Sequence, residues 1–282
     1  MKRIVITGAT SFIGLHLLQE WLNEECEIFA VVRENCQKLQ KLPQNSNLHV
    51  VALNMADYDK LPHLIGKADI FYHLAWEGTR GTARNDMERQ FHNYQCSVKA
   101  FHAAEMLGCC CFVGSGSQAE YGKMNGSVCE ESPCNPLTEY GKQKLNTCQT
   151  LQTLAEKANI RFIWTRIFSL YGVGDDSHTL VSSNIEKMSR NETIPLTECT
   201  QLWDFLYISD AVQAMKQLAL LPHESGIYNL ASGDIRPLRQ YLCEMKETLS
   251  SLSVLDFGAV PYGSEGAVNL IPDISKLLQT GW

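Results

Sequence analysis

The sequence predicts an α/β protein, with a doubly wound parallel sheet and a smaller C-terminal α/β lobe. Three observations support this class. Short β-branched runs alternate with longer helical patterns, a glycine-rich turn directly follows the first run, and the alternation loses its regularity after Tyr171 and Gly172. Strands that alternate with helices in this way indicate parallel strands connected by crossover helices.

The regular alternation lies within residues 1–170. The expected strands are residues 3–7, 27–33, 48–53, 70–75, 110–114 and 161–168, and the expected helices are residues 12–22, about 85–107 and 138–158. Because the first strand leads straight into the glycine turn and a helix, we expect this part to be a dinucleotide-binding Rossmann domain.

The later part of the chain has a weaker pattern. Helices are expected at residues 180–190, 211–221 and 237–249, and strands at residues 205–208 and 227–230. We interpret residues 171–282 as a smaller substrate-binding lobe. Some of its segments are expected to return to the sheet of the first domain.

Composition excludes several classes of protein. Apolar residues make up 45% of the 282 residues and the net charge is -7, which is ordinary for a soluble globular chain and argues against a nucleic-acid binder. No apolar run approaches the roughly 20 residues that span a bilayer, so no membrane partner is expected. The first residues enter a strand directly and leave no room for a signal peptide, so we expect a cytoplasmic protein.

The eleven cysteines are predicted to be reduced and structural. No Cys-x-x-Cys pair occurs, and consecutive residues of a strand point to opposite faces, so Cys109, Cys110 and Cys111 cannot converge on one metal. The histidines have no metal-motif spacing either. We therefore expect no metal site.

The turn after the first strand is the candidate cofactor site. Small residues allow close approach of the backbone to a pyrophosphate, and the N-terminus of the following helix attracts its charge. Ser11 stands where a third glycine is expected, and an ordinary strand–helix turn is the alternative interpretation. The candidate cofactor-binding residues of this turn are Gly8, Thr10, Ser11, Phe12, Ile13 and Gly14.

The end of the second strand favours NADP as cofactor, with NAD possible. A site for NAD generally has a carboxylate about 20 residues beyond the glycines, whereas Val32 and Arg33 occupy this stretch. A guanidinium suits a 2′-phosphate in charge and geometry, and Lys38 can add a second cation. A solvated surface arginine is the alternative.

Tyr140 and Lys144 are the candidate catalytic pair. A helix places residues four apart on one face, so the ammonium can lie beside the phenol. A nearby cation favours the phenolate, and we expect it to bring the pKa of Tyr140 closer to neutrality and make it a general acid or base. Ser117, in a strand exit rich in glycine and serine, can hydrogen-bond a substrate oxygen; a turn serine is the alternative.

These segments together resemble the extended short-chain dehydrogenase/reductase family, the NAD-dependent epimerase/dehydratase group. The resemblance extends over nearly the whole chain. The matching segments are TGATSFIG at 7–14, FYHLA at 71–75, Asn93, GSQAEYG at 116–122, YGKQK at 140–144, RIFSLYG at 166–172, WDFLYISDAV at 203–212, IYNLASG at 227–233 and DISKLLQTGW at 273–282.

The resemblance implies a role for each matching residue. Ser117 polarises a sugar hydroxyl or ketone, Tyr140 is the acid/base, and Lys144 holds the nicotinamide ribose. Asn93 supports the lysine through water. The cofactor cleft is further lined by Leu74, Ala75 and Trp76, with Asn54, Met55 and Asp57 beside the adenine, and the substrate is contacted by Ser117, Gln118, Ser169 and Trp203.

Departures from the family pattern narrow the function. Gln118 and Ala119 stand where 4,6-dehydratases have an Asp-Glu pair, which argues against dehydration. Ser169 replaces an asparagine, and Trp203 and Gly263 replace arginines that commonly hold the diphosphate of a nucleotide sugar. The arginines that could compensate are Arg80, Arg84, Arg166 and Arg236.

The resulting hypothesis is an NAD(P)-dependent enzyme that reduces a 4-keto (deoxy)sugar nucleotide or similar sugar-like ketone. The alternatives are a nucleotide-sugar 4-epimerase with retained NAD and, from another class, a non-catalytic dinucleotide sensor. The helix expected at about residues 85–107 carries apolar side chains that are either core or part of a dimer surface: Phe91, Phe101 and Met106. Because family members often pair through this helix, we expect a homodimer.

Overall fold

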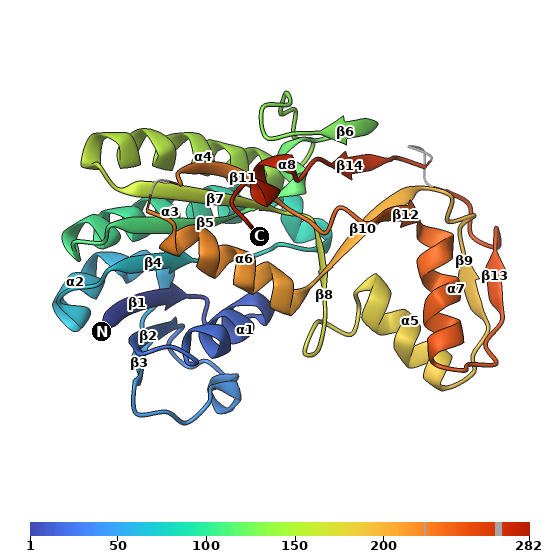
Figure 1. The fold of residues 1–282 in the computed structure, drawn as a ribbon, viewed down its shortest axis with the longest axis horizontal. Coiled ribbons are helices and arrows are strands. Elements are labelled where there is room, and N and C mark those ends of the chain that lie inside the picture. Colours follow the sequence, from blue (N-terminus) through green and yellow to red (C-terminus); the bar gives the residue numbers. More distant parts are fainter. Residues whose placement is uncertain (223, 263–266) are drawn as a thin grey trace.

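A computed structural model describes residues 1–222, 224–262 and 267–282, so Gly263 lies outside the described residues. Seven parallel strands form the central sheet, in the order β11-β7-β5-β4-β1-β2-β3 (Figure 1). The predicted fold class is confirmed. The strands are β1 (Lys2–Thr7), β2 (Cys26–Val32), β3 (Leu48–Ala52), β4 (Ile70–His73), β5 (Cys111–Ser117), β7 (Arg161–Ile167) and β11 (Gly226–Leu230).

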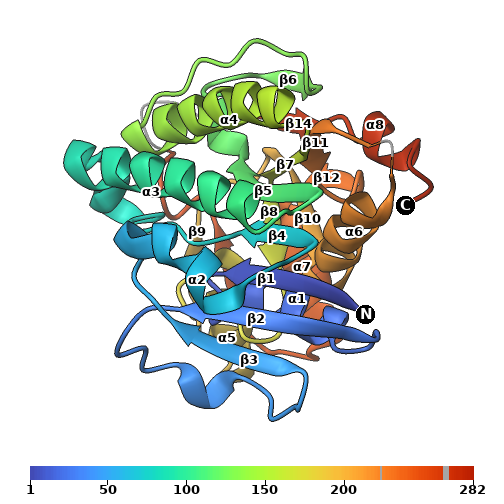
Figure 2. The same cartoon turned by 90° about the vertical axis from the view of Figure 1, so that its left-hand side faces the viewer.

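Helices cover both faces of this sheet. Alternate residues of β1 point to opposite faces: Ile4 and Ile6 pack in one apolar cluster and Val5 in the other. The first cluster includes α1 (Phe12–Trp21) and α6 (Ile208–Leu220). The second includes α2 (Leu61–Ile65), α3 (Met87–Met106) and α4 (Glu139–Ala158). Figure 2 shows α3 and α4 side by side on the face turned to the viewer.

A second lobe lies beyond one end of the sheet, on the right of Figure 1. It contains three small sheets, ordered β12-β10-β8, β13-β9 and β14-β6. Its elements are β6 (Gly126–Val128), β8 (Ser169–Tyr171), α5 (Leu180–Ser189), β9 (Ile194–Leu196), β10 (Leu202–Tyr207), β12 (Ile235–Pro237), α7 (Leu238–Thr248), β13 (Leu255–Phe257) and β14 (Leu270–Pro272). Although they follow residue 170, β11, α6 and α8 (Ser275–Leu278) pack with the central sheet.

Several predicted boundaries were wrong by two or three residues. The strand expected at 205–208 is Leu202–Tyr207, and the helix expected at 211–221 is Ile208–Leu220. The strand expected at 70–75 ends at His73, and the strand expected at 110–114 continues to Ser117, through two glycines that pack against Trp164. The helix expected from about residue 85 begins at Met87, because the Asp86 carboxylate caps it and accepts from Arg89 N at 3.1 Å.

A buried ion pair fixes the end of β5. Glu120 and Arg166 are both almost fully buried, and Arg166 Nε donates to Glu120 Oε2 at 2.9 Å. The other carboxylate oxygen accepts from Ser117 N at 2.9 Å and from Trp164 Nε1 at 3.0 Å. Arg166 Nη1 donates to the carbonyl of Glu130. The pair therefore holds the Ser117 backbone against β7.

We expect Glu120→Gln to lower the free energy of unfolding by about 3–5 kcal/mol, because it leaves the buried Arg166 charge without a counterion. The measurement is urea denaturation at pH 7. Glu186→Gln is the matched control: it breaks an exposed pair with Arg190 and should cost less than about 1 kcal/mol. Equal effects of the two substitutions would contradict the assignment.

Candidate active site

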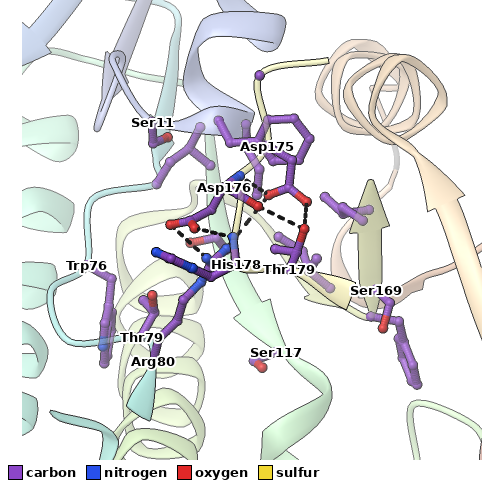
Figure 3. A pocket seen from close by; sticks show the side chains of 18 of the residues that line it. Ser11, Trp76, Thr79, Arg80, Ser117, Ser169, Asp175, Asp176, His178 and Thr179 are labelled. Carbon is purple, nitrogen blue, oxygen red and sulfur yellow. Dashed lines mark hydrogen bonds and ion pairs between the residues drawn. The ribbon is translucent and has the colours of Figure 1, made fainter. Parts of the chain in front are cut away.

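A cavity of about 1130 Å³ lies at the carboxyl ends of the central strands, where the sheet meets the second lobe (Figure 3). Its lining includes residues that follow β1, β4, β5 and β7: Thr10, Leu74, Ser117 and Phe168. Strand order reverses between β1 and β4, the position where open α/β sheets bind ligands. The volume exceeds the roughly 300–1,000 Å³ of most single-ligand pockets, so a cofactor and a substrate can fit together.

The glycine turn brings β1 close to the end of β4. Gly8 has φ +69°, and a Cβ there would lie 2.9 Å from Ala75 N. A Cβ on Gly14 would lie 2.3 Å from the carbonyl oxygen of Gly8. Ser11 caps α1, because its Oγ accepts from Gly14 N at 3.0 Å. The serine thus has a structural reason to replace the expected glycine.

The same turn faces the cavity. Thr10, Ser11, Phe12 and Ile13 line it, at the N-terminus of α1. Backbone N–H groups at a helix N-terminus suit a pyrophosphate, so these residues fit a dinucleotide cofactor. Gly8 and Gly14 do not line the cavity; they let the turn pack closely against Ala75 and against the first turn of α1.

The loop after β4 is held in place by two buried amides of α3. Trp76 Nε1 donates to Gln90 Oε1 at 2.8 Å. The Asn93 amide accepts from Glu77 N and donates to Glu77 O, both at 2.9 Å. The Asn93 side chain was expected to support Lys144 through water, whereas here it is engaged by the main chain of Glu77. Leu74 and Trp76 line the cavity, and Ala75 packs behind them against Gly8.

Ser117, Tyr140 and Lys144 come together in this cavity, as the sequence predicted. Tyr140 and Lys144 lie in the first turns of α4, and the Ser117 side chain lies close enough to the Tyr140 phenol to lower its pKa. Lys144 Nζ donates to the Ser115 carbonyl at 2.7 Å and lies 3.8 Å from the ring centroid of Trp76. The ammonium therefore has a carbonyl and an aromatic face as neighbours in place of water.

The expected effect of Lys144 on the pKa of Tyr140 was wrong for this structure. Burial raises the pKa of the Tyr140 phenol, although the hydrogen bond with Ser117 and the charge of Arg84 oppose this. The Arg84 guanidinium carbon lies 4.5 Å from the Tyr140 ring centroid, closer than the lysine ammonium at 5.8 Å. Burial also lowers the pKa of Lys144 to about 7, which weakens it as a source of positive charge.

Residues expected around the adenosine end are only partly brought to the cavity. Lys38 lines it. Arg33 lies on the surface, where its guanidinium pairs with Glu77 at 3.3 Å. Asn54 donates to Glu34 at 2.8 Å, and Met55 is buried in the apolar cluster under α3.

The substrate side shows a similar division. Ser169 and Trp203 line the cavity, whereas Gln118 belongs to a 3-10 turn (Gln118–Glu120) that caps the end of β5. Of the compensating arginines, Arg166 is bound to Glu120 and Arg80 lines the cavity. Arg236 pairs with two carboxylates and lines a separate cavity between α5 and α7.

Sequence reasoning missed one part of the site. Residues 172–179, between β8 and α5, run along the cavity and contribute the Asp175 and Asp176 carboxylates. The signal available in the sequence was a pair of acids directly after the Gly-Val-Gly of residues 172–174. The pair between Asp176 and Arg80 joins segments that are far apart in the chain, so no local sequence pattern predicts it.

Within residues 1–222, 224–262 and 267–282, no three His, Cys, Asp or Glu side chains gather as a metal site. None of the helices described there combines the length and the apolar composition that a membrane span requires.

Comparison with known proteins gives a consistent result. The family model for the NAD dependent epimerase/dehydratase family matches residues 4–231. CDP-abequose synthase of Salmonella muenchen is 25% identical over an alignment covering 100% of this chain and 92% of that protein. dTDP-4-dehydro-6-deoxyglucose reductase of Escherichia coli is 25% identical, with 99% and 92% covered.

Solved structures share the fold. UDP-N-acetylglucosamine 4-epimerase from Methanobrevibacter ruminantium, in complex with UDP-N-acetylmuramic acid, superposes with a TM-score of 0.89 at 20% identity, covering 100% of this chain and 92% of that chain. UDP-glucose 4-epimerase of Thermus thermophilus, in complex with NAD, gives 0.85 at 18%, covering 99% and 93%. At such identities the likeness shows the fold alone.

We expect Lys144 to make the free energy of unfolding depend on pH. Its folded pKa of about 7 lies below its ordinary value of about 10.4, so between these values the unfolded chain binds more protons. The free energy of unfolding should therefore rise from pH 7 to 8.5, by roughly 1–2 kcal/mol more in the wild type than in Lys144→Met. Urea denaturation measures both; parallel pH curves would show that the ammonium is not desolvated.

Proposed function

Because the chain belongs to the NAD-dependent epimerase/dehydratase family, we propose that it is an NADP-preferring reductase of a 4-keto (deoxy)sugar nucleotide. The observation that carries this proposal is the Ser117–Tyr140–Lys144 cluster, which shares one cavity with the N-terminus of α1. Among the relatives, dTDP-4-dehydro-6-deoxyglucose reductase acts on this substrate class by name. A second relative, 26% identical, is dTDP-6-deoxy-L-talose 4-dehydrogenase (NAD(+)) of Aggregatibacter actinomycetemcomitans, whose name describes oxidation at C4 with NAD.

The side chains of the cluster suit proton transfer to a carbonyl oxygen. When bound, the nicotinamide supplies the hydride. The Tyr140 phenol is in its acid form, because burial raises its pKa, and donates a proton to the substrate oxygen. The Ser117 hydroxyl oxygen accepts from Ala119 N at 3.2 Å, and its own proton can be shared between the Tyr140 phenol and the same substrate oxygen. Lys144, fixed by Ser115, faces the position proposed for the nicotinamide ribose.

Arg33 and Lys38 support NADP over NAD. Val32 ends β2 where a site for NAD has its carboxylate. The pair of Arg33 with Glu77 joins two exposed side chains, so it contributes at most about 1 kcal/mol and can be exchanged for a 2′-phosphate. Lys38 lines the cavity on the same side.

Residues 171–282 are proposed to bind the remainder of the substrate. Trp203 and Phe205 of β10 and Leu180 of α5 form much of the cavity wall on that side. The chain covers 92% of two relatives that act on CDP- and dTDP-linked sugars by name. This supports a nucleotide sugar as substrate.

We also propose a homodimer formed through α3 and α4. Phe101 packs in the core, but Phe91 and Met106 are exposed on α3. Figure 2 shows these two helices uncovered by other elements. A monomer in sedimentation velocity would rule this out.

The cysteines support a reducing compartment such as the cytoplasm. All eleven thiols are free. Disulfides are rare in the cytosol because cellular reductants keep thiols reduced. Detection of the protein outside the cytoplasm by cell fractionation would refute this localisation.

The catalytic proposal is tested with Tyr140→Phe. Purified protein is assayed for NADPH oxidation with CDP- and dTDP-linked 4-keto-6-deoxysugars. We expect turnover to fall about 100-fold or more, since the acid is lost, while NADPH affinity is unchanged. Tyr94→Phe is the matched control, because the Tyr94 hydroxyl contacts Thr150 of α4 and does not line the cavity. NAD that copurifies, with interconversion of sugars and no net oxidation, would indicate the epimerase, and no effect of Tyr140→Phe would indicate the sensor.

The cofactor proposal is tested with Arg33→Gln. Loss of a charge-assisted hydrogen bond should raise the Kd for NADPH about 10-fold or more and leave the Kd for NADH nearly unchanged. Titration of nicotinamide fluorescence measures both values, with Arg190→Gln as the control for an exposed arginine elsewhere. Equal loss of both cofactors, or of neither, would overturn the NADP preference.

A further inference from the structure

Residues 172–179, here called the strap, connect β8 to α5 and are pinned to the first part of the chain at two points. At one end, His16 Nε2 on α1 hydrogen-bonds the Val173 carbonyl at 2.8 Å. Further along, Arg80 Nη1 pairs with Asp176 Oδ2 at 2.8 Å, and Arg80 Nη2 lies 3.7 Å from Asp175 Oδ1. The strap thus reaches both α1 and the loop after β4.

These two attachment points flank the proposed pyrophosphate position. His16 lies in the helix whose N-terminal residues, Ser11 to Ile13, line the cavity, and Arg80 follows Trp76 and Thr79 on its opposite side. Figure 3 shows Asp175 and Asp176 between Ser11 and Arg80. Strap and glycine turn line one cavity, so a dinucleotide at the turn would lie against the strap.

The strap is organised by its own hydrogen bonds. Asp175 accepts from Asp176 N at 2.7 Å and from Thr179 Oγ1 at 2.9 Å, and Asp176 accepts from His178 N at 2.9 Å. Gly174, next to the Val173 that His16 contacts, has φ +86°, and nothing lies within 4 Å of a Cβ built there. Residues 175–179 therefore form one hydrogen-bonded turn, to which Arg80 attaches through the two carboxylates.

The attachments are weak enough to open. Arg80 and Asp176 are about half exposed, at 54% and 46% of their side chains. Exposed pairs of this kind contribute little to stability. They are screened further by salt.

We propose that the strap forms the outer wall of the dinucleotide site, and that the contacts of Arg80 with Asp176 and of His16 with Val173 slow release of the cofactor. Arg80, Asp176 and His16 are then positioning residues that set how long the cofactor stays between turnovers. This inference rests on the proposed function, because it needs a dinucleotide at the glycine turn. It also bears on the difference between a reductase, which must exchange its cofactor, and an epimerase, which retains it.

The test is the dissociation rate of NADPH from the full chain, measured by stopped-flow fluorescence after addition of excess NADP. Arg80→Gln and Asp176→Asn should each raise this rate about 2- to 5-fold, and the double variant should match the single ones because they remove one contact. Added salt should speed release from the wild type more than from either variant. Arg190→Gln is the control, since it removes an exposed pair with Glu186, and neither residue lines the cavity.

Asp176→Asn also distinguishes the proposed role of the strap from the alternative that Arg80 binds the cofactor directly. If Arg80 bound a cofactor phosphate, freeing it from Asp176 would slow dissociation instead of speeding it. Unchanged or slower dissociation of NADPH from Asp176→Asn overturns the proposal that the strap slows cofactor release, and it leaves the proposed function intact. Failure of the wild type to bind either NADPH or NADH overturns both.

Discussion

The buried pair of Glu120 and Arg166 is the constraint on which the site depends. It places a carboxylate where the backbone of Ser117 leaves β5, and this carboxylate also ties β5 to Trp164 of β7. The turn that follows β5 in turn approaches the start of α4 closely, because a Cβ on Gly141 would lie 2.5 Å from the Ala119 carbonyl oxygen. The start of α4 can dock on the Gln118–Glu120 turn only because residue 141 is glycine. The position of Ser117 relative to Tyr140 therefore depends on the buried pair of Glu120 and Arg166 and on glycine at position 141.

The lysine of the cluster shows how function and stability compete. An amine buried beside Trp76 and a carbonyl loses hydration, which is unfavourable for its charged form. A chain selected for stability alone would place an apolar residue there. A ligand with hydroxyl groups near Lys144 would restore polar contacts to the ammonium. The folded protein thus keeps a desolvated cation that a ribose can satisfy.

The sequence predicted those features that have a local pattern. The alternation of strands and helices, the glycine turn and the four-residue spacing of Tyr140 and Lys144 are each contained in a few consecutive residues. The three-residue strands β6, β8, β9, β12, β13 and β14 were missed because three residues show no period. The engagement of Asn93 by Glu77 and the contact of Arg80 with Asp176 were missed for another reason: each depends on how separate loops meet at the cavity.

Charge is distributed unevenly along the cavity, and this bears on what each end can recognise. Lys38 and Lys41 line the end near the glycine turn. Elsewhere along the cavity, Arg80 is matched by Asp175 and Asp176 of the strap. An anionic group arriving there must compete with these carboxylates, whereas a flat or hydroxyl-bearing group meets Trp203, Phe205 and Ser169 without such competition. We therefore expect the wall of the second lobe to recognise its ligand by stacking and neutral hydrogen bonds, and the end near the glycine turn to recognise its ligand by charge.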